Sequence, residues 1–390
     1  MEDYSVRTRK IVGVESIAFV IIFFGMFITL GHTMGAANML STMMNTSFDL
    51  LINTVFYIMA IAVLAGAISA LFTEFGLVAL VNMILSPLMK PLYGLPGAAS
   101  LGVVTTYLSD NPAILSLAAD HGFKRYFKRY QMPALCNLGT SFGMGLIVTT
   151  YMMGVKSASG ESFVSAALIG DLGAVVGSIV STRLMLHFTK QMYGTEDWAI
   201  PRKSEHVEEK LTTREISEGS VAGRVMNCLL SGGKTGVDVG FAIIPGVLII
   251  CTIVMMLTNG PSDSGVYTGA AYEGVAVLPW IGGKINFLLE PLFGFTSASC
   301  IAVPITALGA AGAAIGLVPE MAKSGQVLAN DIAVFTAMCM CWSGYLSTHI
   351  AMMDSLDFRE ATGKAILSHT IGGLCAGVAA HWIYVLISMI

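Results

Sequence analysis

Long apolar runs follow one another along almost the whole of this 390-residue chain. A helix needs about 20 mostly apolar residues to cross the hydrocarbon core of a bilayer, and 55% of the residues are hydrophobic while only 12% are charged. This pattern predicts an all-α polytopic membrane protein. Uninterrupted spans are expected at 11–31, 48–72, 131–154, 161–189, 236–258, 329–353 and 363–388. The first run is too long for a cleaved signal peptide, so we expect it to be retained as a helix.

Glycine and proline interrupt two further apolar regions, at 98–122 and 296–322. Each follows a helical stretch, at 77–93 or 275–293, that ends in Pro-Leu-aromatic-Gly and is expected to lie at the membrane interface. Inside a bilayer, broken backbone is tolerated only where protein or a water-filled cavity satisfies its polar groups. We therefore expect two re-entrant helical hairpins. Their expected turns are 109–112 and 308–312.

A repeat with an offset of 200 residues runs through the chain. The matching positions are Pro91-Leu92-Tyr93-Gly94 with Pro291-Leu292-Phe293-Gly294, Ala98 with Ala298, and Gly173 and Gly177 with Gly373 and Gly377. Asp49 pairs with Asp238 at an offset of 189, and an insertion of eleven residues explains the difference. The expected division is 1–46 for the N-terminal helix and loop, 47–190 for the first repeat, 191–235 for a cytoplasmic connector and 236–390 for the second repeat.

The distribution of Lys and Arg predicts the orientation, because cytoplasmic loops carry an excess of both. The basic positions in and beside short loops are Arg7, Arg9, Lys10, Lys124, Arg125, Lys128, Arg129, Arg202, Lys203, Lys210, Arg214 and Arg224. The loop 259–273 has no Lys or Arg and is expected outside. This threading places the N-terminus in the cytoplasm and the C-terminus outside. It also runs the spans 48–72 and 236–258 in opposite directions, so the two repeats are expected to be inverted.

The first hairpin turn contains the cluster that points most clearly to a binding site. Ser109, Asp110 and Asn111 precede Pro112, which suits the start of a helix with free N–H groups. A carboxylate at membrane depth is energetically unfavourable and is a functional candidate for that reason. The cluster could also serve only as a helix cap. In the binding interpretation it contacts a polar solute or a coupling cation.

Other polar residues in the apolar segments complete the predicted site. Asn137, Thr140 and Ser141 share one helical face, since they are three and four residues apart. The predicted substrate-binding residues are Ser109, Asp110, Asn111, Asn137, Thr140, Ser141, Thr306, Ser343 and Ser347. The candidates for the coupling ion are Asp110, Asp171 and Asn137. Interhelical hydrogen bonding is the alternative role for the residues on these helices.

Several functional classes do not fit the sequence. A net charge of −4 with Lys and Arg in a few loops excludes a general nucleic-acid surface. No Walker-type phosphate loop is present, and no nucleophile, base and orienting group can be aligned from spacing, so we expect neither an ATP-driven pump nor an enzyme. Cys339 and Cys341 could suit a soft metal, but two residues apart on a helix they point about 200° apart, so no metal site is expected.

The Pro-Leu-aromatic-Gly elements and the small-residue hairpins after them resemble the bacterial nucleoside-recognition, or Gate-domain, membrane proteins. The first half is similar to YjiH-type members and the second to YjiG-type members. The group is similar in organisation to concentrative nucleoside transporters. That resemblance implies a bacterial inner membrane, two inverted repeats, an elevator-like transport domain, coupling to Na⁺ or H⁺ and a homo-oligomer, either dimer or trimer. No convincing match exists here to the residues with which those transporters hold a nucleoside.

Together these observations predict a cation-coupled secondary transporter, a symporter of a small polar solute that is nucleoside-like or amino-acid/peptide-like. Na⁺ or H⁺ would be its coupling ion, and no other cofactor is expected. A divalent-metal permease is one alternative, because ferrous-iron transporters also contain Gate-type segments. The other alternative is a structural or assembly protein of the membrane that transports nothing.

Overall fold

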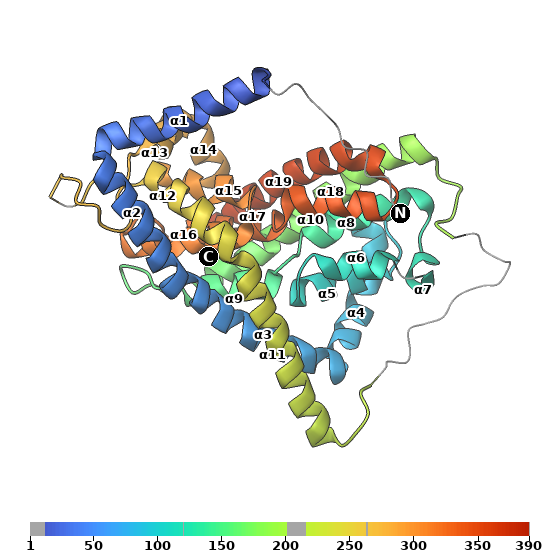
Figure 1. The fold of residues 1–390 in the computed structure, drawn as a ribbon. Helices are drawn as coiled ribbons and strands as arrows, with labels where there is room; N and C mark the ends of the chain where they lie inside the picture. The colour runs from blue at the N-terminus through green and yellow to red at the C-terminus, as the bar shows by residue number, and fades with distance from the viewer. Residues whose placement is uncertain (1–11, 120, 201–215, 263, 390) are drawn as a thin grey trace.

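The computed structural model describes residues 12–119, 121–200, 216–262 and 264–389 (Figure 1). Across these ranges all regular structure is helical, apart from one isolated bridge between Lys128 and Trp198. Six helical stretches in them are long and apolar enough to cross a membrane. They are Val14–Met34, Ala36–Glu74, Arg129–Gly154, Val164–Tyr193, Val221–Thr258 and Arg359–Ser388. The prediction of an all-α, multi-pass membrane protein is therefore confirmed.

The helices of the two halves occur in a similar order. The first half contains α1 (Val14–Met34), α2 (Ala36–Asp49), the π-helical η1 (Leu50–Val55), α3 (Phe56–Glu74), α4 (Leu77–Leu88), η2 (Met89–Tyr93), α5 (Ala99–Leu108), α6 (Pro112–Ala119), α7 (His121–Lys124), η3 (Arg129–Gln131), α8 (Met132–Thr140), α9 (Gly145–Gly154) and α10 (Val164–Tyr193). The second contains α11 (Val221–Gly246), η4 (Val247–Cys251), α12 (Thr252–Thr258), α13 (Val277–Lys284), α14 (Asn286–Phe293), η5 (Ala298–Ile301), α15 (Ala302–Ala307), α16 (Ala311–Lys323), α17 (Ala329–Cys341), α18 (Tyr345–Ser355), η6 (Arg359–Ala361) and α19 (Thr362–Ser388).

Two long helices begin earlier than the sequence predicts. The helix expected at 48–72 begins at Ala36, and the one expected at 236–258 begins at Val221. Each contains one π-helical segment, η1 or η4, where the backbone changes its hydrogen-bonding pattern without ending the helix. The predicted starts were late because the first turns of both helices contain many polar residues and glycines, which an apolar window does not include.

The stretch predicted at 131–154 is long and apolar enough to cross a membrane, as expected, but it and the stretch predicted at 329–353 are each interrupted by a turn, so the expectation that they are uninterrupted is wrong. Each consists of two helices: α8 and α9 in the first half, α17 and α18 in the second. The new helix starts after Met144 or Gly344, with φ at 54° and 69°, and left-handed backbone cannot continue a right-handed helix. These two residues are 200 positions apart, which is the offset of the sequence repeat.

The predicted hairpins are present as helix–turn–helix pairs. In the first, α5 and α6 pack together around a turn at 109–111, and in the second, α15 and α16 pack around a turn at 308–310 (Figure 1). Before each pair, Gly94 and Gly294 adopt left-handed φ values of 73° and 60°, which glycine accepts without a steric penalty. That the hairpins re-enter from one side, that the repeats are inverted and that they divide at the predicted limits stay predictions.

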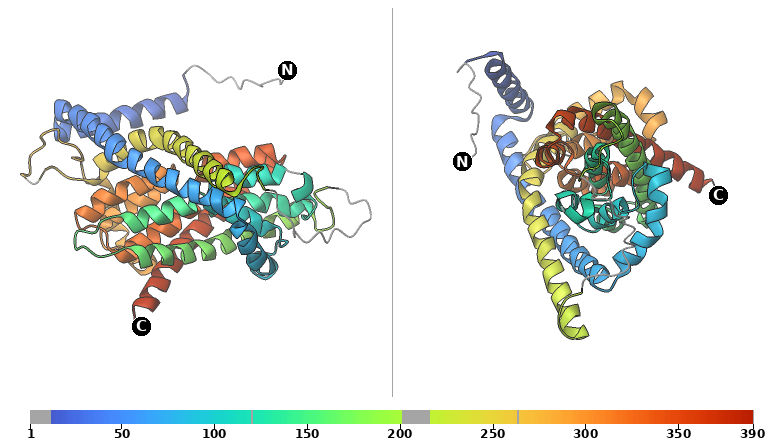
Figure 2. Two further views of the ribbon diagram at one scale, coloured as in Figure 1. Left: turned by 90° about the horizontal axis from the view of Figure 1, so that it is seen from below. Right: turned by 90° about the vertical axis from the view of Figure 1, so that its right-hand side faces the viewer.

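Small residues let the long helices approach closely. An ideal Cβ on Gly66 of α3 would lie 2.3 Å from the carbonyl oxygen of Gly232 on α11, and one on Gly177 of α10 would lie 2.5 Å from that of Gly372 on α19. In lipid, such contacts replace the hydrophobic drive that joins helices in water. Figure 2 shows α2, α3 and α11 along one flank of the molecule, with α1 at its edge.

The predicted orientation stays a prediction. Of its anchors, Arg7, Arg9 and Lys10 lie outside the described residues, as do Arg202, Lys203, Lys210 and Arg214 of the connector.

The large apolar side chains of α1 are exposed, with Val14 at 87% and Ile22 at 71%. In a membrane protein, exposure of this kind is typical of a helix that faces lipid.

Candidate functional site

The two hairpin turns and the two helix breaks meet around one cavity of about 600 Å³, which we call the central cavity. Hairpin residues 109–111 and 309–313 line it, and so do Met144 and Gly344 at the breaks. One face of α11 completes the wall. The polar side chains that line it are those of Ser109, Asp110, Asn111, Thr235, Asp238 and Thr348. Segments that lie far apart in the sequence, from both halves of the chain, therefore build one site.

Hydrogen bonds hold the tip of the first hairpin in place. The Ser109 hydroxyl donates to the Thr105 carbonyl at 2.7 Å, and the Asn111 backbone N–H donates to Asp110 Oδ1 at 2.7 Å. The Asn111 side chain crosses to the other half, where its Nδ2 donates to the Ser343 carbonyl at 2.8 Å. Asn111 thus connects a hairpin of the first half to a helix break of the second.

Glycines at both helix breaks make room for the Asn111 side chain. An ideal Cβ on Gly143 would lie 2.2 Å from Asn111 Oδ1, and one on Gly344 would lie 2.6 Å from Asn111 Nδ2. Any other residue at either position would displace the amide. Asn111 is only 4% exposed, yet its Oδ1 has no hydrogen-bond donor in the part of the chain that the structure describes. A buried acceptor without a donor is energetically unfavourable, which marks this group for a functional role.

The second hairpin presents backbone rather than side chains. Ala310 precedes α16 in extended conformation, with φ at −162°, and no side chain caps the helix. Ala311 and Ala313 are 4% and 1% exposed, and an ideal Cβ on Gly312 would lie 2.9 Å from Ile243 of α11. The first N–H groups of a helix have no partner within it. Small side chains therefore place an uncapped helix N-terminus against the cavity.

Sequence reasoning did not identify the polar residues of α11 as part of the site. Thr235 and Asp238 line the cavity and are exposed to it, but the sequence analysis used Asp238 only to align the repeat. Thr348 of α18 lines it too. A signal was available in the sequence, because Asp238 is the only carboxylate in the predicted span 236–258.

Several predicted binding residues are buried away from the central cavity. Asn137 Nδ2 donates to Ser181 Oγ and to the Ala365 carbonyl, at 3.0 and 2.9 Å. The hydroxyls of Thr140, Ser141 and Thr306 donate to carbonyls of their own helix, and Ser141 also has a side-chain hydrogen bond with Cys341. Ser343 is buried and meets the site through its contact with Asn111; the side chain of Ser347 lies outside the described set. A role for these residues in binding stays a prediction.

No family model matches the sequence. An uncharacterized protein of Alkalihalophilus pseudofirmus is 23% identical over 224 residues, which are 55% of this chain and 46% of that protein, so the match spans about half of the relative's length.

Two solved structures are similar in fold. One is CNTnw in an inward-facing substrate-bound state, with a TM-score of 0.48 and 14% identity over 95% of this chain and 84% of that one. The other is a CNTnw variant in an outward-facing state, with a TM-score of 0.47 and 14% identity over 95% and 85%. At this level the likeness carries no argument about function. Membership of the Gate-domain group stays a prediction.

Asp171 of α10 belongs to a second polar group, next to the first hairpin. Its carboxylate accepts hydrogen bonds from Thr149 Oγ1 at 2.6 Å and from the Tyr107 hydroxyl at 3.2 Å. These partners come from α9 and α5, so the group joins a hairpin helix to a broken helix. Asp171 also borders an apolar cavity of about 360 Å³. No cationic side chain forms an ion pair with Asp171 among the described residues.

The cysteines of α17 do not form a metal site with other described residues. Cys339 and Cys341 are both fully buried, and Cys341 Sγ donates to the Ala174 carbonyl at 3.8 Å. No group of three or more His, Cys, Asp or Glu side chains that could hold a metal ion occurs in the described ranges. The buried His369 is engaged by Ser181 Oγ at 2.9 Å and by the Cys341 carbonyl.

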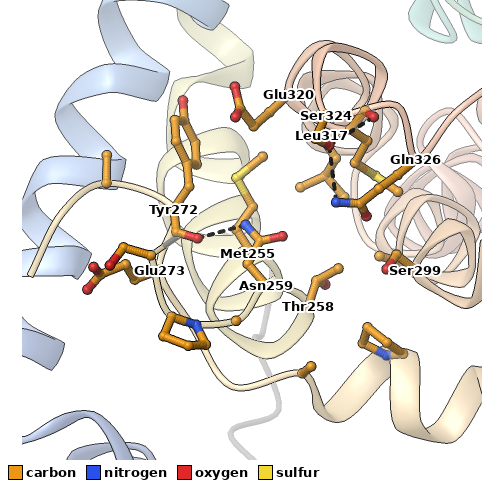
Figure 3. Close-up of a pocket in the computed structure, with 18 of the residues that line it drawn as sticks. Met255, Thr258, Asn259, Tyr272, Glu273, Ser299, Leu317, Glu320, Ser324 and Gln326 are labelled. Atoms are coloured by element: carbon orange, nitrogen blue, oxygen red, sulfur yellow. Dashed lines mark hydrogen bonds between the residues drawn. The ribbon is translucent and has the colours of Figure 1, made fainter. Parts of the chain in front are cut away.

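Another cavity, of about 570 Å³, lies at the opposite end of α16 from the central cavity. Figure 3 shows Leu317, Glu320 and Ser324 on one side of it and the loop that follows α12 on the other. Asn259 Nδ2 donates to the Tyr272 carbonyl at 2.8 Å, and Gln326 Nε2 donates to Ser324 Oγ at 3.1 Å. Both side-chain amides that line this cavity therefore donate hydrogen bonds within the protein.

Proposed function

We propose that this chain is a cation-coupled secondary transporter and that a small polar solute binds in the central cavity. The observation that carries this proposal is the meeting of two hairpin turns and two helix breaks around one cavity of about 600 Å³. Broken backbone is unfavourable in a membrane unless protein or water satisfies it. In secondary transporters, paired discontinuous helices from two repeats form the substrate site near the middle of the bilayer.

The proposed mechanism is elevator-type alternating access. The hairpins and broken helices would move together against the flank formed by α3 and α11, and the cavity would open first to one side of the membrane and then to the other. The wall of the cavity divides along this line, because one face of α11 from Thr235 to Gly246 forms one part of it, while the hairpins, the breaks and Thr348 of α18 form the other. Relative motion of these two groups of segments would open the cavity while each group keeps its own internal packing.

The coupling ion in this proposal is Na⁺ or H⁺. Asp110 borders the cavity, and Asp171 connects the first hairpin to α9 through Tyr107 and Thr149. A carboxylate within a membrane that lacks a basic partner suits a cation or a proton. We further propose a homo-oligomer in a bacterial inner membrane with its N-terminus in the cytoplasm.

Alternating access can be tested without knowing the solute. Thr235→Cys places a thiol on the exposed, cavity-lining face of α11, and a membrane-impermeant methanethiosulfonate cation is then applied to right-side-out and inside-out vesicles. We expect labelling from both sides, with a ratio that changes when Na⁺ or proton gradients are imposed. The native cysteines supply the background, since six are buried and Cys375 is half-buried.

Leu230→Cys is the matched control. Leu230 lies on the same helix and is 69% exposed, but it does not line the cavity. It should resist the reagent from both sides, because a thiolate does not form readily in lipid. Labelling of the Thr235→Cys variant from one side only, whatever the gradient, would contradict alternating access and favour a structural membrane protein.

A further inference from the structure

Two carboxylates line the central cavity. Asp110 and Asp238 line it, and no Lys, Arg or His is among its described lining residues. Asp238 is exposed on α11, and neither carboxylate forms an ion pair with a described residue. Two carboxylates that line one cavity within a membrane protein favour a cationic group there, because a carboxylate at membrane depth needs a partner.

Asn111 adds a neutral acceptor beside Asp110. It is 4% exposed and lines the cavity beside Asp110, and its Oδ1 has no donor among the described residues. Its Nδ2 is already used by the Ser343 carbonyl. The group that remains free is therefore an acceptor, and an ammonium group has three N–H donors to offer such a site.

The N-terminus of α16 offers donors to the same cavity. Ala311, Gly312 and Ala313 form the first turn of α16 and line the cavity, and no side chain caps this helix. Their backbone N–H groups lie at the positive end of the helix dipole, where an anion is favoured. The first hairpin does not repeat this arrangement, because Pro112 starts α6 and has no N–H.

On the basis of the proposed transport function, we propose that the solute is a zwitterion: an amino acid or short peptide with its ammonium group at Asp110, Asp238 and Asn111 Oδ1 and its carboxylate at the N-terminus of α16. Each charged end then meets the group that compensates it. A nucleoside has no formal charge at neutral pH, so it would leave both carboxylates without a cation and the helix N-terminus without an anion.

The test compares ligands that differ by one charge. Detergent-purified full-length protein is screened by thermal shift against the standard amino acids and dipeptides, their methyl esters, their N-acetyl derivatives, and uridine and adenosine. A ligand that binds only the folded protein raises the apparent melting temperature. We expect shifts with the free forms, and a dissociation constant roughly tenfold or more weaker for the ester and for the N-acetyl form, since each lacks one charge-assisted contact.

Two variants test which residues contact the ammonium end and the carboxylate end of the ligand. Asp238→Asn keeps the shape and removes the charge, and we expect at least about tenfold weaker binding of the free form. Ala311→Pro removes one N–H at a position where proline fits a helix, and Ala310 already has the extended backbone that precedes proline. We expect it to weaken free forms while leaving the binding of esters unchanged. Glu290→Gln, exposed and outside the cavity, is the charge-matched control.

The outcomes separate this inference from the transport proposal. Three outcomes would each contradict a zwitterionic solute. They are esters that bind as well as the free forms, nucleosides that bind while amino acids and dipeptides do not, and no thermal shift with any compound of the panel. The ligand series on the unmodified protein decides this even if a variant fails to fold. Alternating access is decided independently by the two-sided labelling of Thr235→Cys.

Discussion

Asn111 Nδ2 donates a hydrogen bond of 2.8 Å to the backbone carbonyl of Ser343, and these residues come from opposite halves of the chain. Asn111 is at the tip of the first hairpin, while Ser343 is in the break between α17 and α18. The bond closes one wall of the central cavity. It also makes the break in the second half depend on the first half, because the Ser343 carbonyl in this turn needs a donor that its own helix does not supply.

Replacing Asn111 with alanine should therefore affect both stability and transport. The Asn111→Ala variant leaves the Ser343 carbonyl buried without this donor, and we expect a loss of about 1–3 kcal/mol in the free energy of unfolding. Thermal unfolding in detergent measures this loss, and solute uptake into proteoliposomes should fall strongly. Asn53→Ala is the control, since Asn53 also donates a 2.8 Å bond, to Asp49, but on an exposed surface. Equal unfolding temperatures for the two variants would contradict the structural role of Asn111.

The contact between α3 and α11 gives a second prediction. It compares the same substitution, glycine to alanine, at two positions of α11. An ideal Cβ on Gly236 would lie 2.3 Å from the Ala62 carbonyl oxygen, whereas one on Gly233 would have its nearest neighbour, Val63 Cγ1, at 3.4 Å. We expect Gly236→Ala to force the helices apart and to lower stability by about 1–3 kcal/mol. Gly233→Ala should change it by much less. Thermal unfolding of both variants in the same detergent checks this, and similar losses would mean that the close approach does not determine the packing.

The sequence predicted the helical class, the two hairpin turns and the recurrence of the Gly94 and Gly294 elements because each has a local signal. Apolar length predicts a span, and a left-handed glycine after Pro-Leu-aromatic predicts a stop. The breaks after Met144 and before Tyr345 were missed because the segments around them are apolar enough on average to resemble continuous spans. In a buried helix the sequence pattern does not change where the backbone turns.

The candidate site was predicted in part for the same reason. Ser109, Asp110 and Asn111 were found because polar residues beside Pro112 stand out in an apolar segment. The N-terminus of α16 offers only backbone donors from Ala311, Gly312 and Ala313. A site made of backbone N–H groups is not indicated by any particular side-chain type in the sequence. Thr235 joins the cavity through the packing of α11, which depends on tertiary contacts between halves and cannot be read from spacing within one helix.

Asp171 gives a prediction about coupling. Asp171→Asn keeps the size of the side chain and its bond from Thr149 but removes the negative charge. We expect solute uptake driven by an Na⁺ or proton gradient to fall at least about tenfold, since the ionised acceptor is lost, while exchange of solute across equal ion concentrations continues. Both are measured with proteoliposomes, using a solute found in the ligand screen. Tyr107→Phe, which removes only the neutral donor at 3.2 Å, should have a smaller effect. Loss of exchange together with gradient-driven uptake would place Asp171 in folding or solute binding instead.

Glu273 stabilises the loop between α12 and α13, and its protonation predicts how the loop responds to pH. Its carboxylate accepts hydrogen bonds from the Thr268 backbone N–H at 3.0 Å, the Thr268 hydroxyl at 2.7 Å and the Gly269 N–H at 2.9 Å. Burial alone would raise the pKa of Glu273, but these hydrogen bonds outweigh it and hold the pKa below its usual range. The ionised form therefore stabilises the loop at neutral pH.

The pH dependence of this stabilisation follows from the lowered pKa. A carboxylate with a depressed folded pKa contributes fully above the unfolded value of about 4.3 and loses its contribution as pH falls through the folded pKa. We expect hydrogen exchange in residues 264–276 to be faster in Glu273→Gln than in the unmodified protein at pH 7, and the difference to disappear only below about pH 4. Comparing both proteins at each pH cancels the intrinsic pH dependence of exchange. A difference that disappears between pH 5 and 7 would require a raised pKa, and the hydrogen bonds from Thr268 and Gly269 could then not be the dominant influence on this carboxylate.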